Sequence, residues 1–258
     1  MNAIAHLSDL HFGTEDPVLV RRLLVELDEL QPRLTVISGD LTQRARRAQF
    51  AAARRFIDAL PAPVLVVPGN HDIPLWDVTR RIVSPLGRYR SYITPDLCPF
   101  HRDGALAVLG LNTTRPARWK EGEISPAQAD LIRDRLGDLE NGLVKVVVTH
   151  HPFIPPPDQP RLAVVGGRAT ALAALRDAGV DLLLSGHLHL GYSGLLDERP
   201  GLLSVQASTA VSRRRRGQPN GYNVIHLAAA GGPVLETRRW DGQTFRSVTV
   251  PTLRHSPR

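Results

Sequence analysis

Short apolar runs alternate with longer amphipathic stretches through the first 190 residues of the chain. Six runs, rich in Val, Ile and Leu, have the length and composition of strands buried on both faces. They are residues 3–7, 34–38, 64–67, 105–111, 144–149 and 180–184. Between them, apolar residues recur at helical spacing in stretches that begin near residues 16, 43, 125 and 168. Strands that alternate with helices predict an α/β fold with helices outside the sheet.

The chain after residue 190 has a different pattern. Residues 202–207, 222–228, 234–240 and 244–250 resemble strands joined by turns, with Asp241-Gly242 as a hairpin signal. Because no helical stretch separates them, we expect a β-rich part over 191–250 that completes a second sheet. It follows an α/β part over 1–190, and we expect both to form a single domain over 1–258. The tail after Pro251 is expected to be frayed.

Composition narrows the chemistry. The single cysteine, Cys98, excludes an intramolecular disulfide and a Cys-rich metal site. No apolar stretch approaches the ~20 residues that span a bilayer. Residues 1–6 lack a basic region before an apolar one, so we expect a cytoplasmic protein with no membrane partner. The net charge of +7 does not by itself indicate nucleic-acid binding, but it suits an anionic substrate.

Polar side chains directly follow five of the six buried runs. In chain order they are Asp9, His11, Asp40, Asn70, His71, Asp72, His150, His151, His187 and His189. In open α/β sheets, ligands bind at the carboxyl ends of the strands. We therefore expect these side chains, although spread over 180 positions, to converge at one edge.

Carboxylate, amide and imidazole groups without thiolates suit Mn, Fe, Zn or Co. Asp9 and His11 lie two residues apart, as do His187 and His189, so each pair can reach one ion. The whole set exceeds what one ion needs, which predicts two divalent ions with Asp40 as the bridging ligand. Each motif alone has an ordinary structural interpretation, such as a helix-capping carboxylate after a strand. The ordered set of five favours a shared metal site.

The ordered motifs resemble those of the calcineurin-like metallophosphoesterase family, and most of all its bacterial class III cyclic-nucleotide phosphodiesterase branch. They are Asp9-Leu10-His11, Gly39-Asp40-Leu41, Gly69-Asn70-His71-Asp72, His150-His151-Pro152 and Gly186-His187-Leu188-His189. The resemblance implies a four-layer α-β-β-α sandwich with two central mixed sheets. It also implies a role for each metal ligand. Asp9, His11 and His189 would bind the first ion. Asn70, His150 and His187 would bind the second ion, and Asp40 would bridge the two.

The resemblance further implies a catalytic role for His71 beside the substrate phosphate. The expected reaction is hydrolysis of a small phosphodiester by a metal-bound hydroxide, with 3′,5′-cAMP as the leading candidate substrate. Glycerophosphodiesters and aryl or alkyl diesters are alternatives. A DNA nuclease of the same superfamily is another, although the chain shows no added nucleic-acid-binding domain. A non-enzymatic scaffold is disfavoured because every expected ligand is present, and a homo-oligomer is compatible with the sequence.

Four further assignments rest on single positions. Asp72 either orients His71 or caps a helix. Asn112 follows the fourth apolar run and is a candidate for the substrate pocket. His151 neighbours a predicted ligand and is a candidate phosphate contact. Arg213 begins a run of four arginines, which is either a solvated basic loop or a contact for the substrate phosphate.

Overall fold

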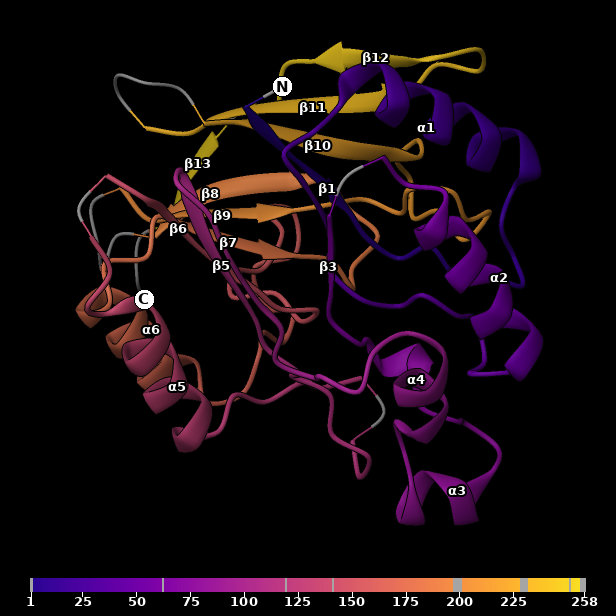
Figure 1. The fold of residues 1–258 in the computed structure, drawn as a ribbon, viewed down its shortest axis with the longest axis horizontal. Coiled ribbons are helices and arrows are strands. Elements are labelled where there is room, and N and C mark those ends of the chain that lie inside the picture. The colour runs from indigo at the N-terminus through magenta and orange to yellow at the C-terminus, as the bar shows by residue number, and fades with distance from the viewer. Residues whose placement is uncertain are drawn as a thin grey trace.

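Two β-sheets lie face to face at the centre of the molecule, and helices cover the outer face of each (Figure 1). The computed structural model describes residues 2–61, 63–118, 120–140, 142–196, 201–227, 232–250 and 252–255. In spatial order, the six-stranded sheet holds β12 (Phe245–Val248), β11 (Val234–Trp240), β10 (Gly221–His226), β1 (Ala3–Leu7), β2 (Leu34–Ile37) and β3 (Val64–Val66). The seven-stranded sheet holds β13 (Thr252–His255), β8 (Tyr192–Leu196), β9 (Leu203–Gln206), β7 (Leu182–Ser185), β6 (Val144–Val148), β5 (Leu106–Gly110) and β4 (Phe100–Arg102).

The helices divide between the two outer faces. Apolar residues of α1 (Pro17–Leu30), α2 (Arg47–Asp58) and α4 (Gly87–Tyr92) pack on the six-stranded sheet. Those of α5 (Pro126–Leu136) and α6 (Arg168–Asp177) pack on the seven-stranded sheet. The short α3 (Val78–Val83) lies beside α4. In the part of the chain that the structure describes, no helix has the length and apolar character needed to cross a membrane.

The side chains of the central strands alternate between two apolar cores. In β1, Ile4 packs between the sheets, whereas Ala3, Ala5 and Leu7 face the helices. In β6, Val147 faces the helices and its neighbours on either side face the other sheet. Strands buried on both faces explain why these runs are apolar throughout. The predicted four-layer α-β-β-α sandwich with two mixed sheets is confirmed.

Parallel pairing brings the ends of the polar-tipped strands together. β1 pairs in parallel with β2, and β2 with β3, in one sheet. β5, β6 and β7 pair in parallel in the other sheet. The loops that leave β1, β2, β3, β6 and β7 therefore gather where the two sheets meet at the same end.

The strands after residue 190 divide between the two sheets. β8 and β9 extend the seven-stranded sheet, while β10, β11 and β12 extend the six-stranded one. The β-rich part expected over residues 191–250 therefore adds strands to both sheets. Within the six-stranded sheet, β10 pairs antiparallel with β1 and covers an edge that would otherwise be open. Residues 252–255, expected to be frayed, form β13 in parallel with β8.

Candidate metal centre

The predicted metal ligands converge at the strand ends. Asp9, His11, Asp40, His150 and His189 are buried, and Asn70 and His187 are partly buried. Asn70 begins a single 3-10 turn, η1 (Asn70–Asp72), that follows β3. The other six leave β1, β2, β6 and β7 directly.

Asp9, His11 and His189 form the first group. Nε2 of His189 lies 3.0 Å from Nε2 of His11 and 3.2 Å from Oδ1 of Asp9. The Nδ1–H of His189 donates to the carbonyl oxygen of Arg214 at 2.6 Å, so the neutral ring presents a lone pair at Nε2. Oδ1 of Asp9 is buried and has no hydrogen-bond partner among the residues that the structure describes. Electron-pair donors that face one another in this way fit a bound cation.

Asn70, His150 and His187 form the second group. Oδ1 of Asn70 lies 3.1 Å from both Nε2 of His150 and Nδ1 of His187. The Nδ1–H of His150 donates to the carbonyl oxygen of Ser38 at 2.8 Å, which directs the Nε2 lone pair at the group. Three donor atoms on three separate strand ends thus point at one position.

Asp40 lies between the two groups. Its Oδ2 is 3.6 Å from Nε2 of His11, and its Oδ1 is 3.4 Å from Nε2 of His150. Oδ1 also accepts the backbone N–H of His71 at 2.8 Å. Taken with the two facing sets of donors, this carboxylate makes the cluster fit two divalent ions.

Charge is unevenly distributed over the cluster. Burial alone would raise the pKa of Asp40, but the imidazoles of His150, His71 and His11 together outweigh burial and lower that pKa. Conversely, burial would lower the pKa of His150, but the charge and hydrogen bond of Asp40, with the charge of Asp9, together raise it to about 9. Burial and the charge of His150 together lower the pKa of His187 to about 3. A proton on His150 therefore competes with a cation for the same lone pair.

The backbone of the cluster is strained. Five of its residues adopt the left-handed region, with φ of 52° at Asp9, 46° at His11, 52° at Asp40, 73° at His187 and 59° at His189. Non-glycine residues rarely occupy this region, and they persist there when surrounding contacts impose it. One such contact joins the backbone N–H of His187 to Oδ2 of Asp9 at 2.9 Å.

Two glycines let backbone approach the carboxylates. A Cβ atom at Gly186 would collide with Ser8 and Asp9. A Cβ atom at Gly69 would collide with Asp40. The residues before His187 and Asn70 therefore need to be glycines, because a larger side chain would occupy the space of the neighbouring carboxylates.

Asp72 does not orient the His71 ring as one interpretation predicted. Its carboxylate accepts backbone N–H groups of Gly69, Leu41 and Thr42, at 2.9, 3.2 and 2.9 Å. The ring of His71 is held instead through Nδ1, which donates to the carbonyl oxygen of Gln43 at 2.9 Å. Burial and the nearby charge of Asp40 raise the pKa of Asp72 to about 7. Asp72 is thus a loop-organising residue, closer to the capping alternative.

The side chains of Asn112 and Arg213 bond to residues outside the two groups of ligands, and their assignment to the substrate pocket stays a prediction. Oδ1 of Asn112 accepts the N–H and hydroxyl of Thr114 at 3.0 and 2.7 Å. It follows β5, one strand farther out than β6. The Arg213 side chain is 69% exposed and faces Asp16, with 3.8 Å between Nε and Oδ2.

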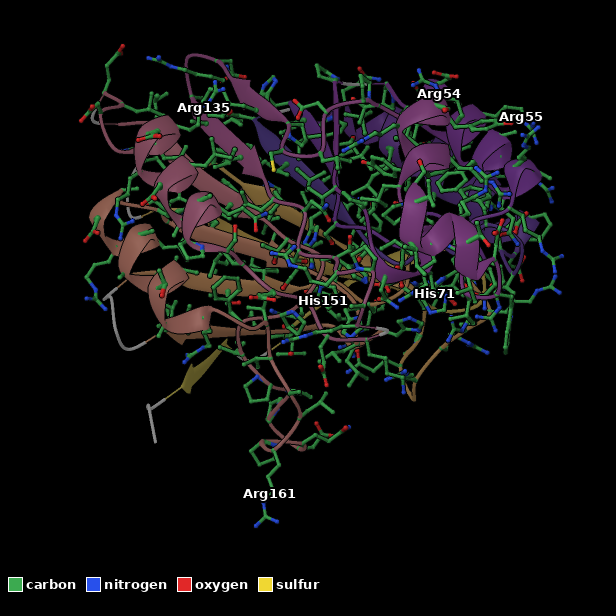
Figure 2. The ribbon with its side chains drawn as sticks, turned by 90° about the horizontal axis from the view of Figure 1, so that it is seen from below. Arg54, Arg55, His71, Arg135, His151 and Arg161 are labelled. Atoms are coloured by element: carbon green, nitrogen blue, oxygen red, sulfur yellow. The ribbon has the colours of Figure 1, made fainter. Side chains whose placement is uncertain are left out.

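A cavity of about 270 Å³ lies against the two groups. His151, a predicted phosphate contact, is one of the residues that line this cavity. Its Nδ1 lies 2.7 Å from the hydroxyl of Thr113. Figure 2 shows His71 and His151 near the middle of the molecule, whereas Arg54, Arg55, Arg135 and Arg161 lie at its periphery. The lining residues are Asp40, Asn70, His71, Lys120, Glu121, Gly122, His151, Pro152, Leu162, Ala163, Val164, His187, Leu188, His189, Arg214 and Arg216.

Arg214 also lies at the cavity wall, although the sequence pattern marked only the arginine run and not this residue. Its Nη1 lies 3.2 Å from Nε2 of His71 and 3.1 Å from Oε1 of Gln43. The four-arginine run was the available signal, but periodicity does not tell which member of a turn points inward.

Comparisons with known proteins agree with this geometry. The calcineurin-like phosphoesterase family matches residues 3–191. A probable cyclic nucleotide phosphodiesterase of Synechococcus sp. is 24% identical over 202 residues, 74% of each chain. The glycerophosphodiester phosphodiesterase GpdQ of Enterobacter lignolyticus is 34% identical over 172 residues, which cover 59% of this chain and 57% of that protein.

Solved structures share the fold at low sequence identity. Purple acid phosphatase PPD1 from yellow lupin gives a TM-score of 0.70 at 13% identity, over 98% of this chain and 54% of that one. A dimetal phosphatase from Danio rerio gives 0.65 at 13% identity, over 96% and 99%. At these identities, the likeness concerns the fold.

Proposed function

This chain belongs to the calcineurin-like phosphoesterase family and is a metal-dependent phosphoesterase, and we propose on that premise that it hydrolyses small phosphodiesters. The leading candidates are 3′,5′-cyclic nucleotides such as cAMP. The name of the Synechococcus relative supports this choice. The cavity beside the cluster, about 270 Å³, is of a size for a small substrate.

The position of Asp40 carries the proposal. One carboxylate oxygen faces His11 of the first group and the other faces His150 of the second. We assign Asp9, His11 and His189 to the first ion, Asn70, His150 and His187 to the second, and Asp40 to both. Two bound divalent ions would neutralise charge on a phosphoryl group and lower the pKa of water.

The chain's own residues prepare the ligands for this task. Backbone carbonyl oxygens of Ser38 and Arg214 hold the Nδ1–H groups of His150 and His189, so each ring directs Nε2 inward and offers its lone pair once that nitrogen has lost its proton. The amide of Asn70 supplies an uncharged oxygen, which adds no negative charge where the anionic diester binds.

His71 lies beside the position of the substrate phosphate in this proposal. Its Nδ1–H donates to Gln43, which leaves Nε2 as a hydrogen-bond acceptor. Burial lowers the pKa of His71, so the imidazole is uncharged near neutral pH. A neutral ring positions a hydrogen-bond donor by accepting from it at Nε2, and the leaving oxygen then takes its proton from water.

Glycerophosphodiesters are the second candidate class. The relative that is 34% identical carries the name glycerophosphodiester phosphodiesterase. A glycerol substituent and a ribose differ mainly outside the scissile phosphate, so the same ligand set serves both. Discrimination between the two substrate classes would then depend on the residues of the cavity wall rather than on the two groups of metal ligands.

The test compares substrates on one preparation. Metal-free protein is loaded with Mn²⁺, and kcat/KM is measured for 3′,5′-cAMP, glycerophosphoethanolamine and bis(p-nitrophenyl) phosphate. We expect hydrolysis of the aryl diester and a higher kcat/KM for cAMP than for the glycerophosphodiester. A higher value for the glycerophosphodiester would replace cAMP with the second class.

Asp40→Asn is the control for the bridge. We expect it to lower the number of tightly bound Mn²⁺ ions per chain and to abolish hydrolysis of all three diesters. No diester hydrolysis by wild-type protein carrying two ions would reject the proposed function.

A further inference from the structure

Arg214 contacts the candidate site through both its backbone and its side chain. Its carbonyl oxygen accepts Nδ1–H of His189 at 2.6 Å. Its Nη1 group donates to Nε2 of His71 and to Oε1 of Gln43, at 3.2 and 3.1 Å. A guanidinium cannot accept, so Nε2 of His71 is the acceptor of this bond. His71 and Gln43 thereby fix the orientation of the guanidinium.

The remaining donors of Arg214 are available to a ligand. Both bonds to the protein use Nη1, and no acceptor among the described residues bonds to Nη2 or Nε. The residue is half-buried and lines the cavity together with Asp40, Asn70 and His189. A fixed cation with free donors at the wall of such a cavity is arranged for an oxyanion.

The pairing of residues 209–213 with the loop after β1 explains how one arginine of the run points inward. The backbone N–H of Arg213 donates to the carbonyl oxygen of Thr14, and the hydroxyl of Thr209 donates to that of Asp9. This part of the chain therefore lies along the loop that carries Asp9 and His11. Arg213 faces Asp16 on the outside, and Arg214 faces His71.

We propose that Arg214 binds a non-bridging oxygen of the substrate phosphate, with His71 and Gln43 as the residues that position its guanidinium. This inference rests on the proposed function, because it places the scissile phosphate between the two groups of ligands and Arg214. This contact adds a charged hydrogen-bond donor to phosphate recognition. The guanidinium stays in position while negative charge spreads over the phosphoryl oxygens in the transition state.

The test uses a matched pair of substitutions in the arginine run. Arg214→Met and Arg213→Met each remove one positive charge from adjacent positions and leave the backbone carbonyl in place. Binding of inorganic phosphate to the Mn²⁺-loaded proteins is measured by calorimetry, together with kcat/KM for bis(p-nitrophenyl) phosphate and the Mn²⁺ content.

We expect Arg214→Met to weaken phosphate binding and to lower kcat/KM by about 10- to 100-fold, as for a lost bond to a charged group. Arg213→Met should stay within about twofold of wild type, because its side chain is solvated. Both variants should retain wild-type Mn²⁺ content. Arg214→Lys should recover only part of the loss, since lysine lacks the fork that reaches His71 and phosphate together.

Equal phosphate binding by the two methionine variants would overturn the inference. Loss of Mn²⁺ in Arg214→Met would also overturn it, because the residue would then act through His189 alone. If wild-type protein hydrolyses no diester but its phosphate binding still depends on Arg214, the proposed function fails and the anion contact stands.

Discussion

One carboxylate oxygen of Asp72 accepts both the backbone N–H and the hydroxyl of Thr42, at 2.9 and 3.0 Å. The two residues lie 30 positions apart, on the loops that follow β2 and β3. The same loops carry Asp40 and Asn70. This buried pair therefore sets the spacing between the bridging carboxylate and the amide of the second group.

Asp72→Ala should destabilise the protein and loosen metal binding together. It leaves backbone N–H groups of three residues without their buried acceptor, which costs about 2–4 kcal/mol in the free energy of unfolding. Denaturant unfolding and Mn²⁺ titration measure the two effects. Asp58→Ala, at an exposed position on α2, is the control. Full stability with reduced turnover would instead indicate a direct catalytic role for Asp72.

Asn70→Ala and His71→Ala should separate metal binding from turnover. The first removes an oxygen that faces His150 and His187, so Mn²⁺ affinity should fall by about 10-fold or more. The second should keep both ions and reduce kcat by about 10²–10⁴-fold, most for diesters with poor leaving groups. Metal content and kcat on aryl and alkyl diesters give the comparison. Unchanged turnover of every diester by His71→Ala would show that its assigned role is wrong.

Metal uptake should release a proton at neutral pH. Because the pKa of His150 in the metal-free protein is raised to about 9, this ring holds a proton at pH 7. Mn²⁺ must displace it, so affinity should rise about tenfold per pH unit between pH 7 and about 9. Calorimetry in two buffers of different ionisation enthalpy counts the protons. A pH-independent affinity over this range would contradict the raised pKa.

Gly186→Ala should impair metal binding by the first group of ligands through a steric collision alone. The added methyl group collides with Ser8 and Asp9, so either the loop or the carboxylate has to shift. We expect a loss of about 1–3 kcal/mol in unfolding free energy and weaker Mn²⁺ binding. Gly104→Ala is the matched control, since its Cβ would meet no atom of the described residues within 4 Å. If Gly186→Ala binds Mn²⁺ as tightly as Gly104→Ala does, close backbone approach is not a requirement of the site.

The convergence of the ligands was predictable because it follows from local pattern and one geometric rule. Apolar runs mark β1, β2, β3, β6 and β7, and parallel strands share an edge for their carboxyl ends. Knowing that Asp9 and His187 each end such a run is enough to bring them together. The contact between them is the hydrogen bond from the N–H of His187 to Asp9.

Residue-level orientation was not predictable in the same way. Asn112 ends a parallel strand, yet β5 lies outside β6 and its amide bonds locally to Thr114. In the arginine run, the difference between Arg213 and Arg214 depends on how the turn pairs with residues near Thr14. The partition of the late strands between two sheets depends equally on long-range pairing, which local pattern does not encode.

The antiparallel pairing of β1 with β10 also affects the order in which the six-stranded sheet can assemble during synthesis. The first strand of the chain is 217 residues from its register partner at Asn223, opposite His6. During synthesis, β1 can pair with β2 early, but its second edge stays unpaired until the ribosome has released residues 221–226. Nascent chains halted near residue 200 should therefore expose a bare strand edge to solvent or to a chaperone, and the six-stranded sheet should gain cooperative stability only once residues 221–226 have emerged.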